Sequence, residues 1–367
     1  MILYINGNYP HHSLHCELVS RLADLGNIIT VFVPIKGAEL VDKYQCDHPR
    51  VKIEYCNCLT TLDKVFFCNK THKLTKYIEQ TVDLSKVDCI LAGTLYSDGA
   101  VAYLLHKKYS IPFSVAIRQT DVTHHMKWRP YLNGFIKRLL QRSKKIIFIS
   151  PSYKQYVNKI GDYQDKYIVI PNAVNDFWFI NSPKIKTVHD PISIIYVGEI
   201  TKNKNICSTI LAVAELKKQG ILLNFHIVGS GEEEENCRTL TKQMGIQKQV
   251  FFHGWQDKME MIKRLYEQTD IFVMLSYRET FGTVYIEAIS QGLPIIYTKN
   301  QGIDGYFEEG SVGYRCNPTD IDELVEKISQ TIKRYPIISK NCFSESKRFT
   351  WETVANKYNE VICSTRE

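Results

Sequence analysis

Short runs of apolar and β-branched residues recur along the chain, and stretches long enough for a helix separate them. Seven runs lie in the first half and five in the second. Near-continuous apolar runs predict strands buried on both faces, and their alternation with amphipathic helices is typical of parallel sheets. The runs are residues 2–6, 28–34, 51–55, 89–93, 113–118, 145–150, 167–171, 192–198, 224–229, 250–254, 271–276 and 294–298.

The polar stretch 181–191 carries two prolines and separates the two sets of predicted strands, so it is predicted to be a linker. A length of 367 residues also favours two domains. The prediction is an α/β protein with Rossmann-like parallel-sheet domains at 1–180 and 181–367, facing a central cleft at the carboxyl ends of their strands. The last helix is expected to pack back on the N-terminal domain.

Composition excludes several classes of protein. The chain is 44% hydrophobic and 23% charged, which argues against disordered, collagen-like and disulfide-stapled chains. No apolar run approaches the roughly 18 residues that span a bilayer, and the N-terminus lacks the features of a signal peptide. The 11 cysteines are scattered without a Cys-X-X-Cys pair, so we expect reduced thiols in the cytoplasm.

Positive charge is concentrated in the first half. Residues 1–180 hold 23 Lys and Arg against 15 Asp and Glu, a net of +8, whereas residues 181–367 carry a net of −1. Two stretches, 64–78 and 127–145, mix basic and aromatic residues, and the second contains no acidic residue. Such a stretch is either a surface that docks on anionic lipid or a core-facing stripe with a solvated basic back. Nucleic acid fits poorly, because no recognised binding motif is present.

Glycines follow the first two predicted strands of the second half. Gly198 precedes Lys202 and Lys204, and a glycine at a strand end lets the main chain approach an anion. Gly229 and Gly231 resemble part of a dinucleotide fingerprint, but the third glycine is missing and four glutamates follow. The pattern argues against a nicotinamide cofactor and leaves a tight turn before an acidic helix start as the alternative.

The strongest chemical signal lies at 276–297, where a strand is followed by Arg-Glu-Thr-Phe-Gly-Thr and a helix. Glu279 precedes the free main-chain N–H groups of Phe281, Gly282 and Thr283, an arrangement suited to a ligand with many hydroxyls. Glu287 lies in an otherwise apolar helix, so it should face hydroxyls or a polar cleft. The alternative is that both glutamates are capping or surface residues.

Seven residues separate Glu279 from Glu287. With this spacing and its surrounding sequence, the segment resembles the retaining glycosyltransferases of family 4, which have the GT-B fold. Further blocks that resemble the family, in the same order along the chain, are 170–179, 197–205, 227–235, 250–254, 270–276 and 300–318. The resemblance implies that Glu279 and the main chain at Phe281 and Gly282 bind the donor sugar and that Glu287 binds the ribose of its nucleotide. Thr283 is a further donor-binding candidate.

The resemblance also implies that the main chain at Gly198 and Gly229 lies against the donor and that its base lies near His253 and Gly254. Lys204 corresponds to the family's phosphate-binding lysine. Glu199 stands where the family has an arginine, which reverses the charge there, and Lys202 is the candidate to compensate.

The first half resembles the family less closely. Residues 8–13 replace a Gly-Gly loop, which places His12 and Ser13 on the acceptor side, and Asp121 is a further acceptor-side candidate. Arg118 ends a strand and could neutralise phosphate charge, the alternative being a structural salt bridge. His11, His12, His15 and Cys16 do not form a convincing metal site, because a second ligand cluster is missing.

These features predict a retaining glycosyltransferase that uses a nucleotide sugar, UDP- or GDP-linked, without a metal cofactor. The acceptor is expected to be a glycan or a lipid-linked glycan, with Glu279, Arg118 and Lys204 as the catalytic set. The expected location is the cytoplasm, at the inner face of the plasma membrane if the basic surface docks there. The alternatives are a catalytically weak subunit that binds sugar nucleotides and an epimerase of related fold.

Overall fold

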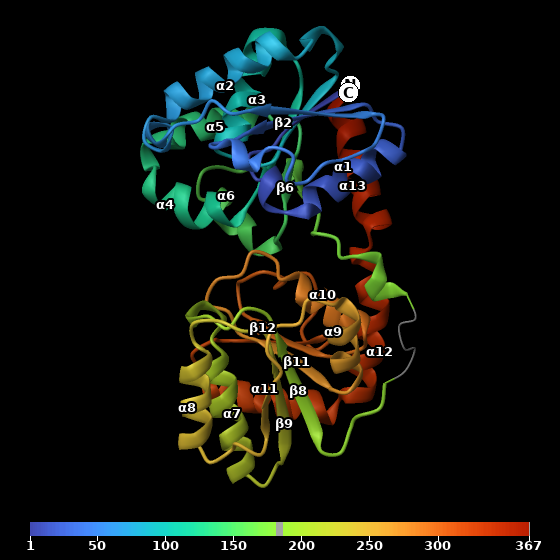
Figure 1. Cartoon of the computed structure of the whole chain (residues 1–367). Helices are drawn as coiled ribbons and strands as arrows, with labels where there is room; N and C mark the ends of the chain where they lie inside the picture. Colours follow the sequence, from blue (N-terminus) through green and yellow to red (C-terminus); the bar gives the residue numbers. More distant parts are fainter. Residues whose placement is uncertain (181–185, 367) are drawn as a thin grey trace. The chain divides into compact units, whose positions relative to one another are not determined.

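The computed structural model describes residues 1–180 and 186–366 (Figure 1). The chain divides into two compact units. The first comprises Met1–Ile149, Tyr153–Ala173 and the residues from Trp351 onward, and the second comprises Ser150–Ser152 and Val174–Thr350. The boundary therefore falls before the predicted position at 180, because Trp178 packs its ring 5.7 Å from that of Tyr266 in the second unit.

The first unit is built on a seven-stranded parallel sheet in the order β3-β2-β1-β4-β5-β6-β7. Its strands are β1 (Ile2–Ile5), β2 (Ile29–Pro34), β3 (Val51–Cys56), β4 (Cys89–Ala92), β5 (Phe113–Ile117), β6 (Ile146–Phe148) and β7 (Tyr167–Val169). The helices are α1 (Ser13–Asp24), α2 (Phe67–Thr81), α3 (Ser97–Tyr109), α4 (Met126–Trp128), α5 (Asn133–Arg142), α6 (Lys154–Asn158) and α13 (Trp351–Arg366).

Alternating side chains of the first sheet enter two separate cores. Leu3 and Ile5 of β1 join the core under α2, α3 and α5, whereas Ile2 and Tyr4 join the core under α1 and α13. Figure 1 shows these two groups of helices on opposite sides of the sheet. The last helix belongs to this first unit, since Trp351, Val354, Tyr358, Val361 and Ile362 are buried beside α1.

The second unit holds a six-stranded parallel sheet in the order β10-β9-β8-β11-β12-β13. Its strands are β8 (Ile192–Val197), β9 (Leu223–Val228), β10 (Val250–Phe252), β11 (Ile271–Met274), β12 (Ile295–Thr298) and β13 (Gly313–Cys316). The helices are α7 (Ile206–Lys218), α8 (Glu234–Gln243), α9 (Met259–Glu267), α10 (Thr283–Ser290), α11 (Ile321–Lys333) and α12 (Tyr335–Ser346).

Every predicted strand is present, and the structure adds β13, which the hydrophobic pattern missed. This edge strand is short, begins with Gly313 and exposes Arg315, so it lacks a continuous apolar run. The predicted linker also needs correction. Residues 181–185 lie outside the described residues, but His189 is fixed to the second unit by hydrogen bonds from its ring and its main-chain N–H to Asp270.

Both sheets reverse their strand order beside the first strand of the unit. In the second unit the reversal lies between β8 and β11, which are hydrogen-bonded neighbours. In open parallel sheets, ligands bind at the carboxyl ends of the strands at such a reversal. A ligand site in this unit is therefore expected at the loops after β8 and β11.

Candidate active site

The loops after β8 and β11 are joined by Asn203. Its side chain accepts a hydrogen bond from the N–H of Arg278 at 3.1 Å and donates one to the Arg278 carbonyl at 2.9 Å. Its own carbonyl accepts from the N–H of Tyr277 at 2.8 Å. Next to it, Asn205 accepts from the Tyr277 hydroxyl at 3.2 Å and holds a left-handed backbone with φ of 52°. The two loops thus form one hydrogen-bonded unit.

This connection places Lys204 opposite Glu279. The lysine Nζ lies 2.7 Å from Oε2 of Glu279, and the side chains are 23% and 13% exposed. Oε1 of Glu279 accepts a hydrogen bond from the N–H of Thr280 at 3.1 Å, and Ser276 Oγ lies 3.4 Å from Oε2. Two residues that the sequence assigned separately, to phosphate and to sugar, therefore form an ion pair with little exposure to solvent.

Glycines keep side chains away from the main chain at the ends of β8, β9 and β10. A Cβ on Gly229, whose φ is 135°, would lie 1.8 Å from the Gly198 carbonyl oxygen. The N–H of Gly229 donates to the carbonyl of Gly254 at 2.8 Å, and Gly254 has φ of 68°. A Cβ on Gly231 would lie 2.4 Å from the Ile200 carbonyl. The predicted donor-binding glycines Gly198, Gly229 and Gly254 thus lie together at the carboxyl ends of β8, β9 and β10.

His253 lies at the same edge, after β10. Its ring stacks on His226 with centroids 5.2 Å apart, and its Nε2 lies 2.9 Å from Nδ1 of His226. One ring must donate and the other accept, so the pair requires at least one neutral imidazole. Burial lowers the pKa of His253, and burial followed by the charge of His253 lowers the pKa of His226 to about 4. Both shifts favour the neutral imidazole.

Helix α10 begins four residues after Glu279 in the sequence. Gly282 precedes the helix with φ of 79°, and Thr283 is its first residue. Phe281 is buried, and its ring packs edge-on against Tyr306 at 5.7 Å. The ring of Phe281 is thus occupied by core packing, and the binding role of its main chain remains a prediction. The first N–H groups of a helix lack partners within the helix and favour negative charge.

Glu287 lies one turn further along α10. Its carboxylate makes no hydrogen bond or ion pair with any of the described residues, and burial raises its pKa to about 7. It lies near enough to the buried Tyr266 to contribute to the raised pKa of that phenol, whose hydroxyl also lacks a partner among the described residues. An acceptor in this state suits a ligand that brings its own hydroxyl donors.

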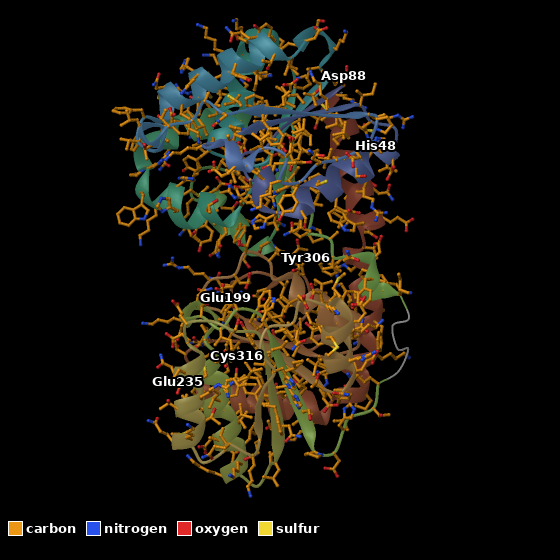
Figure 2. All side chains as sticks on the ribbon, in the orientation of Figure 1. His48, Asp88, Glu199, Glu235, Tyr306 and Cys316 are labelled. Atoms are coloured by element: carbon orange, nitrogen blue, oxygen red, sulfur yellow. The ribbon has the colours of Figure 1, made fainter. Side chains whose placement is uncertain are left out.

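Lys202 and Glu199 lie on the solvent side of the same loop. Both side chains are exposed, and Lys202 makes no contact with a partner in the described part of the chain. Figure 2 labels Glu199 in the loop after β8. Its carbonyl accepts from the Tyr196 hydroxyl at 2.8 Å. Lys202, the lysine expected to compensate for Glu199, thus lies outside the ion pair of Lys204 with Glu279.

Arg118 and Asp121 belong to the first unit, after β5. Arg118 Nε donates to the Gly93 carbonyl at 3.1 Å, and the charge of Arg118 also lowers the pKa of the nearby Asp121 against the larger effect of burial. Asp121 is buried and accepts from the N–H groups of Leu95, Tyr96 and Arg118 at 2.9 to 3.3 Å. Burial raises the pKa of Asp121 to about 6. This carboxylate orders the loop, and a role toward an acceptor stays a prediction.

His12 and Ser13 lie at the start of α1, where both side chains are exposed. His15 is buried, with Nδ1 3.2 Å from the Tyr4 hydroxyl, and Cys16 Sγ donates to the Gln45 carbonyl. Within residues 1–180 and 186–366, no group of three His, Cys, Asp or Glu side chains is arranged to hold a metal ion. The acceptor-side assignments of His12 and Ser13 remain predictions.

Sequence reasoning missed Asn203, Asn205 and Gln301. Gln301 Oε1 accepts from the N–H of Glu279 at 3.3 Å, and the N–H of Gly302 donates to the Glu279 carbonyl at 3.1 Å. All three missed residues lie in sequence blocks that resemble the family. Their types are common in loops, however, and their partners are up to 113 residues away in the chain. Only the fold shows that they position Glu279.

Family models match both halves of the chain. Residues 179–348 match "Glycosyl transferases group 1" and residues 15–176 match "Glycosyltransferase Family 4". Both halves of the chain thus match models of glycosyltransferases. The chain therefore belongs to the glycosyltransferases of these families. The family 4 match lies in the first unit and the group 1 match lies almost wholly in the second.

The curated relatives include enzymes of cell-surface glycan synthesis. The lipopolysaccharide core biosynthesis glycosyltransferase LpsE of Rhizobium meliloti is 26% identical over 50% of this chain and 54% of its own length. The alpha-monoglucosyldiacylglycerol synthase of Acholeplasma laidlawii is 25% identical over 92% of this chain and 89% of its own. The chain spans about half the length of several of these relatives, including LpsE.

Solved structures share the fold. Anabaena Alr3699/HepE in complex with UDP aligns with a TM-score of 0.74 at 18% identity, over 99% of each chain. The lipopolysaccharide outer core galactosyltransferase WaaB aligns with a TM-score of 0.76 at 17% identity, also over 99% of each chain. The fold is therefore of the GT-B type. None of the described helices has the length and apolar character needed to cross a membrane.

Proposed function

We propose that the protein transfers a sugar from a nucleotide sugar to a glycan or lipid-linked acceptor, with retention of configuration at the anomeric carbon. The observation that carries this proposal is the Lys204–Glu279 ion pair, 2.7 Å long, beside glycine-lined strand ends and the N-terminus of α10. It combines a cation for a diphosphate with an acceptor for sugar hydroxyls. The family membership of both units supports the same reaction.

In the proposed reaction, the bond between the anomeric carbon and the diphosphate oxygen breaks, and a bond to an acceptor hydroxyl oxygen forms. The departing diphosphate gains negative charge, which Lys204 and the N-terminus of α10 are placed to stabilise. The acceptor proton passes to the leaving phosphate oxygen, so a separate general base is not required. Glu279 holds the donor sugar and thereby orients the anomeric carbon.

Glu287 is proposed to bind the ribose hydroxyls. A hydroxyl donor would satisfy a carboxylate that has no hydrogen bond within the described residues and whose pKa is raised to about 7. His253 and Gly254, at the end of β10, are proposed to lie against the base. We propose a UDP or GDP sugar as donor, and relatives described as complexes with UDP support the first of these.

The acceptor is proposed from the relatives. Their names include lipopolysaccharide core, colanic acid and diacylglycerol products. We propose that this chain likewise acts in the cytoplasm on a glycan or a lipid-linked glycan, without a metal cofactor, and that it works at the inner face of the plasma membrane when the acceptor is lipid-linked.

The decisive experiment has two stages. A thermal-shift screen against UDP, GDP and ADP sugars identifies the donor, since a ligand at 100 times its dissociation constant stabilises by about 2.7 kcal/mol. Release of the nucleoside diphosphate is then measured with and without glycan acceptors, for the native chain and for Glu279→Ala. Loss of transfer in the variant, with the fold intact, is the expected result. Binding without any turnover in the native chain would favour the alternative, a sugar-nucleotide-binding subunit.

A further inference from the structure

Cys207 and Cys237 meet between two neighbouring helices of the second unit. Cys207 is the second residue of α7 and Cys237 the fourth of α8, and these helices lie side by side (Figure 1). Their sulfur atoms are 3.9 Å apart. A disulfide bond is about 2.05 Å long, so the two sulfurs need to approach by about 2 Å to form one. The structure thus holds two reduced thiols within reach of each other.

The two thiols differ in exposure and in acidity. Cys207 is half-buried in the first turn of α7, whereas Cys237 is 1% exposed. The contact with Cys237 lowers the pKa of Cys207 against the effect of burial, and the same contact, followed by burial, raises the pKa of Cys237. The free N–H groups at the start of a helix also favour a thiolate. Cys207 is therefore the thiol that ionises and meets solvent, and Cys237 is the partner behind it.

Other cysteines lack this combination. Cys56 and Cys58, at the end of β3 and just after it, have sulfurs 2.8 Å apart, but burial raises the pKa of Cys56. Cys68 and Cys363 are exposed, and neither contacts a second sulfur among the described residues. Proximity of two sulfurs, partial exposure and a position at a helix start coincide at Cys207.

The first turn of α7 is connected to the ion pair of the candidate site. Ser208 Oγ donates to Oδ1 of Asn205 at 2.8 Å, and the Tyr277 hydroxyl donates to the same oxygen at 3.2 Å. Lys204 directly precedes Asn205, and Tyr277 lies in the loop that carries the glutamate partner. A displacement of Cys207 is therefore passed through Asn205 to both loops of the ion pair.

The start of α8 is connected to the same site. The N–H of Cys237 donates to the Glu233 carbonyl at 3.0 Å, and the N–H of Glu233 donates to the Ile200 carbonyl at 3.0 Å. Gly231 lies so close to that carbonyl that a Cβ on it would be 2.4 Å away. Because Ile200 belongs to the loop after β8, a bond from Cys207 to Cys237 would join the two helices at the ends that carry the glycine-lined main chain.

We infer that Cys207 and Cys237 form a reversible disulfide on reaction with a peroxide, and that this bond weakens binding of the nucleotide sugar. The Cys207 thiolate attacks one peroxide oxygen, the O–O bond breaks, and Cys207 becomes a sulfenic acid. The other oxygen leaves as hydroxide and takes up the proton that Cys207 lost, which gives water. The Cys237 thiol then attacks the Cys207 sulfur, and the sulfenic oxygen leaves with the thiol proton as a second water. Two thiols are oxidised and one peroxide is reduced.

The surroundings of the pair favour a transient bond with an effect on the site. In the cytoplasm, the location proposed above, thiols are kept reduced, and disulfides that do form there are usually transient or redox-sensing. Cys237 is packed in the interior, so the half-buried first turn of α7 makes more of the approach. A displacement of about 1 Å at an active site costs about 100-fold. The effect on donor binding rests on the proposed function, whereas formation of the disulfide does not.

Peptide mapping of the full chain tests the bond. The reduced chain is treated with hydrogen peroxide, alkylated and digested with trypsin. We expect a disulfide that joins peptides 205–217 and 219–238 and disappears with dithiothreitol. The control Cys363→Ser, an exposed cysteine of the first unit, should form the same bond. Absence of the joined peptides from the oxidised native chain would overturn the inference.

A sulfenic acid reagent tests the order of the two steps. In Cys237→Ala the second thiol is missing, so dimedone should label Cys207 after peroxide treatment. In Cys207→Ser no label is expected on the buried Cys237. A label on Cys237 in that variant would show that it attacks the peroxide and would overturn the assignment of Cys207.

Binding of UDP, GDP and ADP tests the consequence. For the nucleotide that binds, we expect the oxidised chain to bind at least about tenfold more weakly and dithiothreitol to restore the affinity. By linkage, the nucleotide should raise the reduction potential of the disulfide by about 30 mV, which is a tenfold change for two electrons. Peroxide should not alter the affinity of Cys207→Ser, while Cys363→Ser should respond like the native chain. An unchanged affinity of the oxidised native chain would overturn the inference.

Hydrogen exchange separates this inference from the proposed function. If none of the three nucleotides binds the reduced chain, the proposed donor is wrong, and amide exchange in residues 199–205 and 229–236 decides whether the disulfide acts on the candidate site. We expect exchange there to change on oxidation of the native chain and to stay the same in Cys207→Ser. Identical exchange in the reduced and oxidised native chain would overturn the inference.

Discussion

The strand ends of the two units differ in what they present. In the second unit, Gly198, Gly229 and Gly254 leave the main chain bare. In the first unit, side chains fill the corresponding place: Asn6 lies against Gly93, where a Cβ would be 2.7 Å from its side chain, and Arg118 donates to the Gly93 carbonyl. A bare main chain suits a diphosphate, which approaches closely and needs N–H donors.

The acids of the two units differ in the same way. Asp121, after β5, uses its oxygens on three main-chain N–H groups of its own unit. Glu279, after β11, is paired with Lys204, whose flexible side chain can turn toward a ligand. Loops at the carboxyl ends of two similar sheets thus hold a structural carboxylate in one unit and an exchangeable one in the other. This contrast supports donor binding by the second unit.

The bare main chain gives the largest predicted effect. Gly229→Ala places a Cβ 1.8 Å from the Gly198 carbonyl oxygen, so both loops must move. We expect a loss of about 4 kcal/mol or more in stability and no detectable donor binding. Gly220→Ala is the control, because Gly220 has φ of 82° but no atom within 4 Å of its Cβ position. It should lose only about 1–2 kcal/mol.

Chemical denaturation and donor titration of both glycine variants measure these losses. Equal losses would mean that the left-handed backbone, and not the close approach of the two loops, determines the effect.

Lys204 gives the next largest effect. Lys204→Ala removes the cation proposed to face the diphosphate, and we expect kcat to fall by about 10²- to 10³-fold, as for the loss of one donor that stabilises developing charge. Lys202→Ala, in the same loop but exposed and outside the ion pair, should change kcat by less than about threefold, an effect below 1 kcal/mol. A larger loss in Lys202→Ala than in Lys204→Ala would assign the phosphate to Lys202 and break the proposed arrangement.

The two acids separate stability from activity. Asp121→Ala leaves the N–H groups of Leu95, Tyr96 and Arg118 without an acceptor, so we expect a loss of about 3 kcal/mol in stability. Glu279→Ala leaves Lys204, which is 23% exposed and can reach water, so its loss should be about 1 kcal/mol while transfer disappears. Unfolding curves and initial rates, measured on both variants, test the contrast. It fails if Glu279→Ala is the less stable protein.

Much of the fold follows from the sequence because strands buried on both faces are apolar throughout. That signal predicted twelve of the thirteen strands among the described residues and failed for β13, which lies at an edge and exposes Arg315. Glu279 and Lys204 could each be chosen from their sequence neighbourhood. Their ion pair could not, because Asn203 creates it by connecting loops about 75 residues apart. The hydrogen bonds of Asp121 are equally a product of tertiary structure.

The smallest predicted effect concerns Glu287. Burial raises its pKa from 4.5 to about 7, so the folded protein holds this proton more tightly than the unfolded chain does. Stability should therefore fall as the pH rises between about 4.5 and 7, and remain lower above it. Glu287→Gln removes this cost. Because the side chain keeps some contact with solvent, we expect a gain of about 2 kcal/mol at pH 8 and none at pH 4.

The same variant should bind the nucleotide sugar more weakly, because an amide oxygen accepts a ribose hydroxyl less strongly than a carboxylate does. Gln291, one turn along from Glu287, provides a control: its Nε2 donates to the Trp178 carbonyl, so Gln291→Glu should be destabilised more at pH 8 than at low pH. Opposite pH dependences of the two variants would confirm that burial destabilises the ionised carboxylate of Glu287. A Glu287→Gln protein that is no more stable at pH 8 would show that this carboxylate is already solvated, and the proposed ribose contact would lose its physical basis.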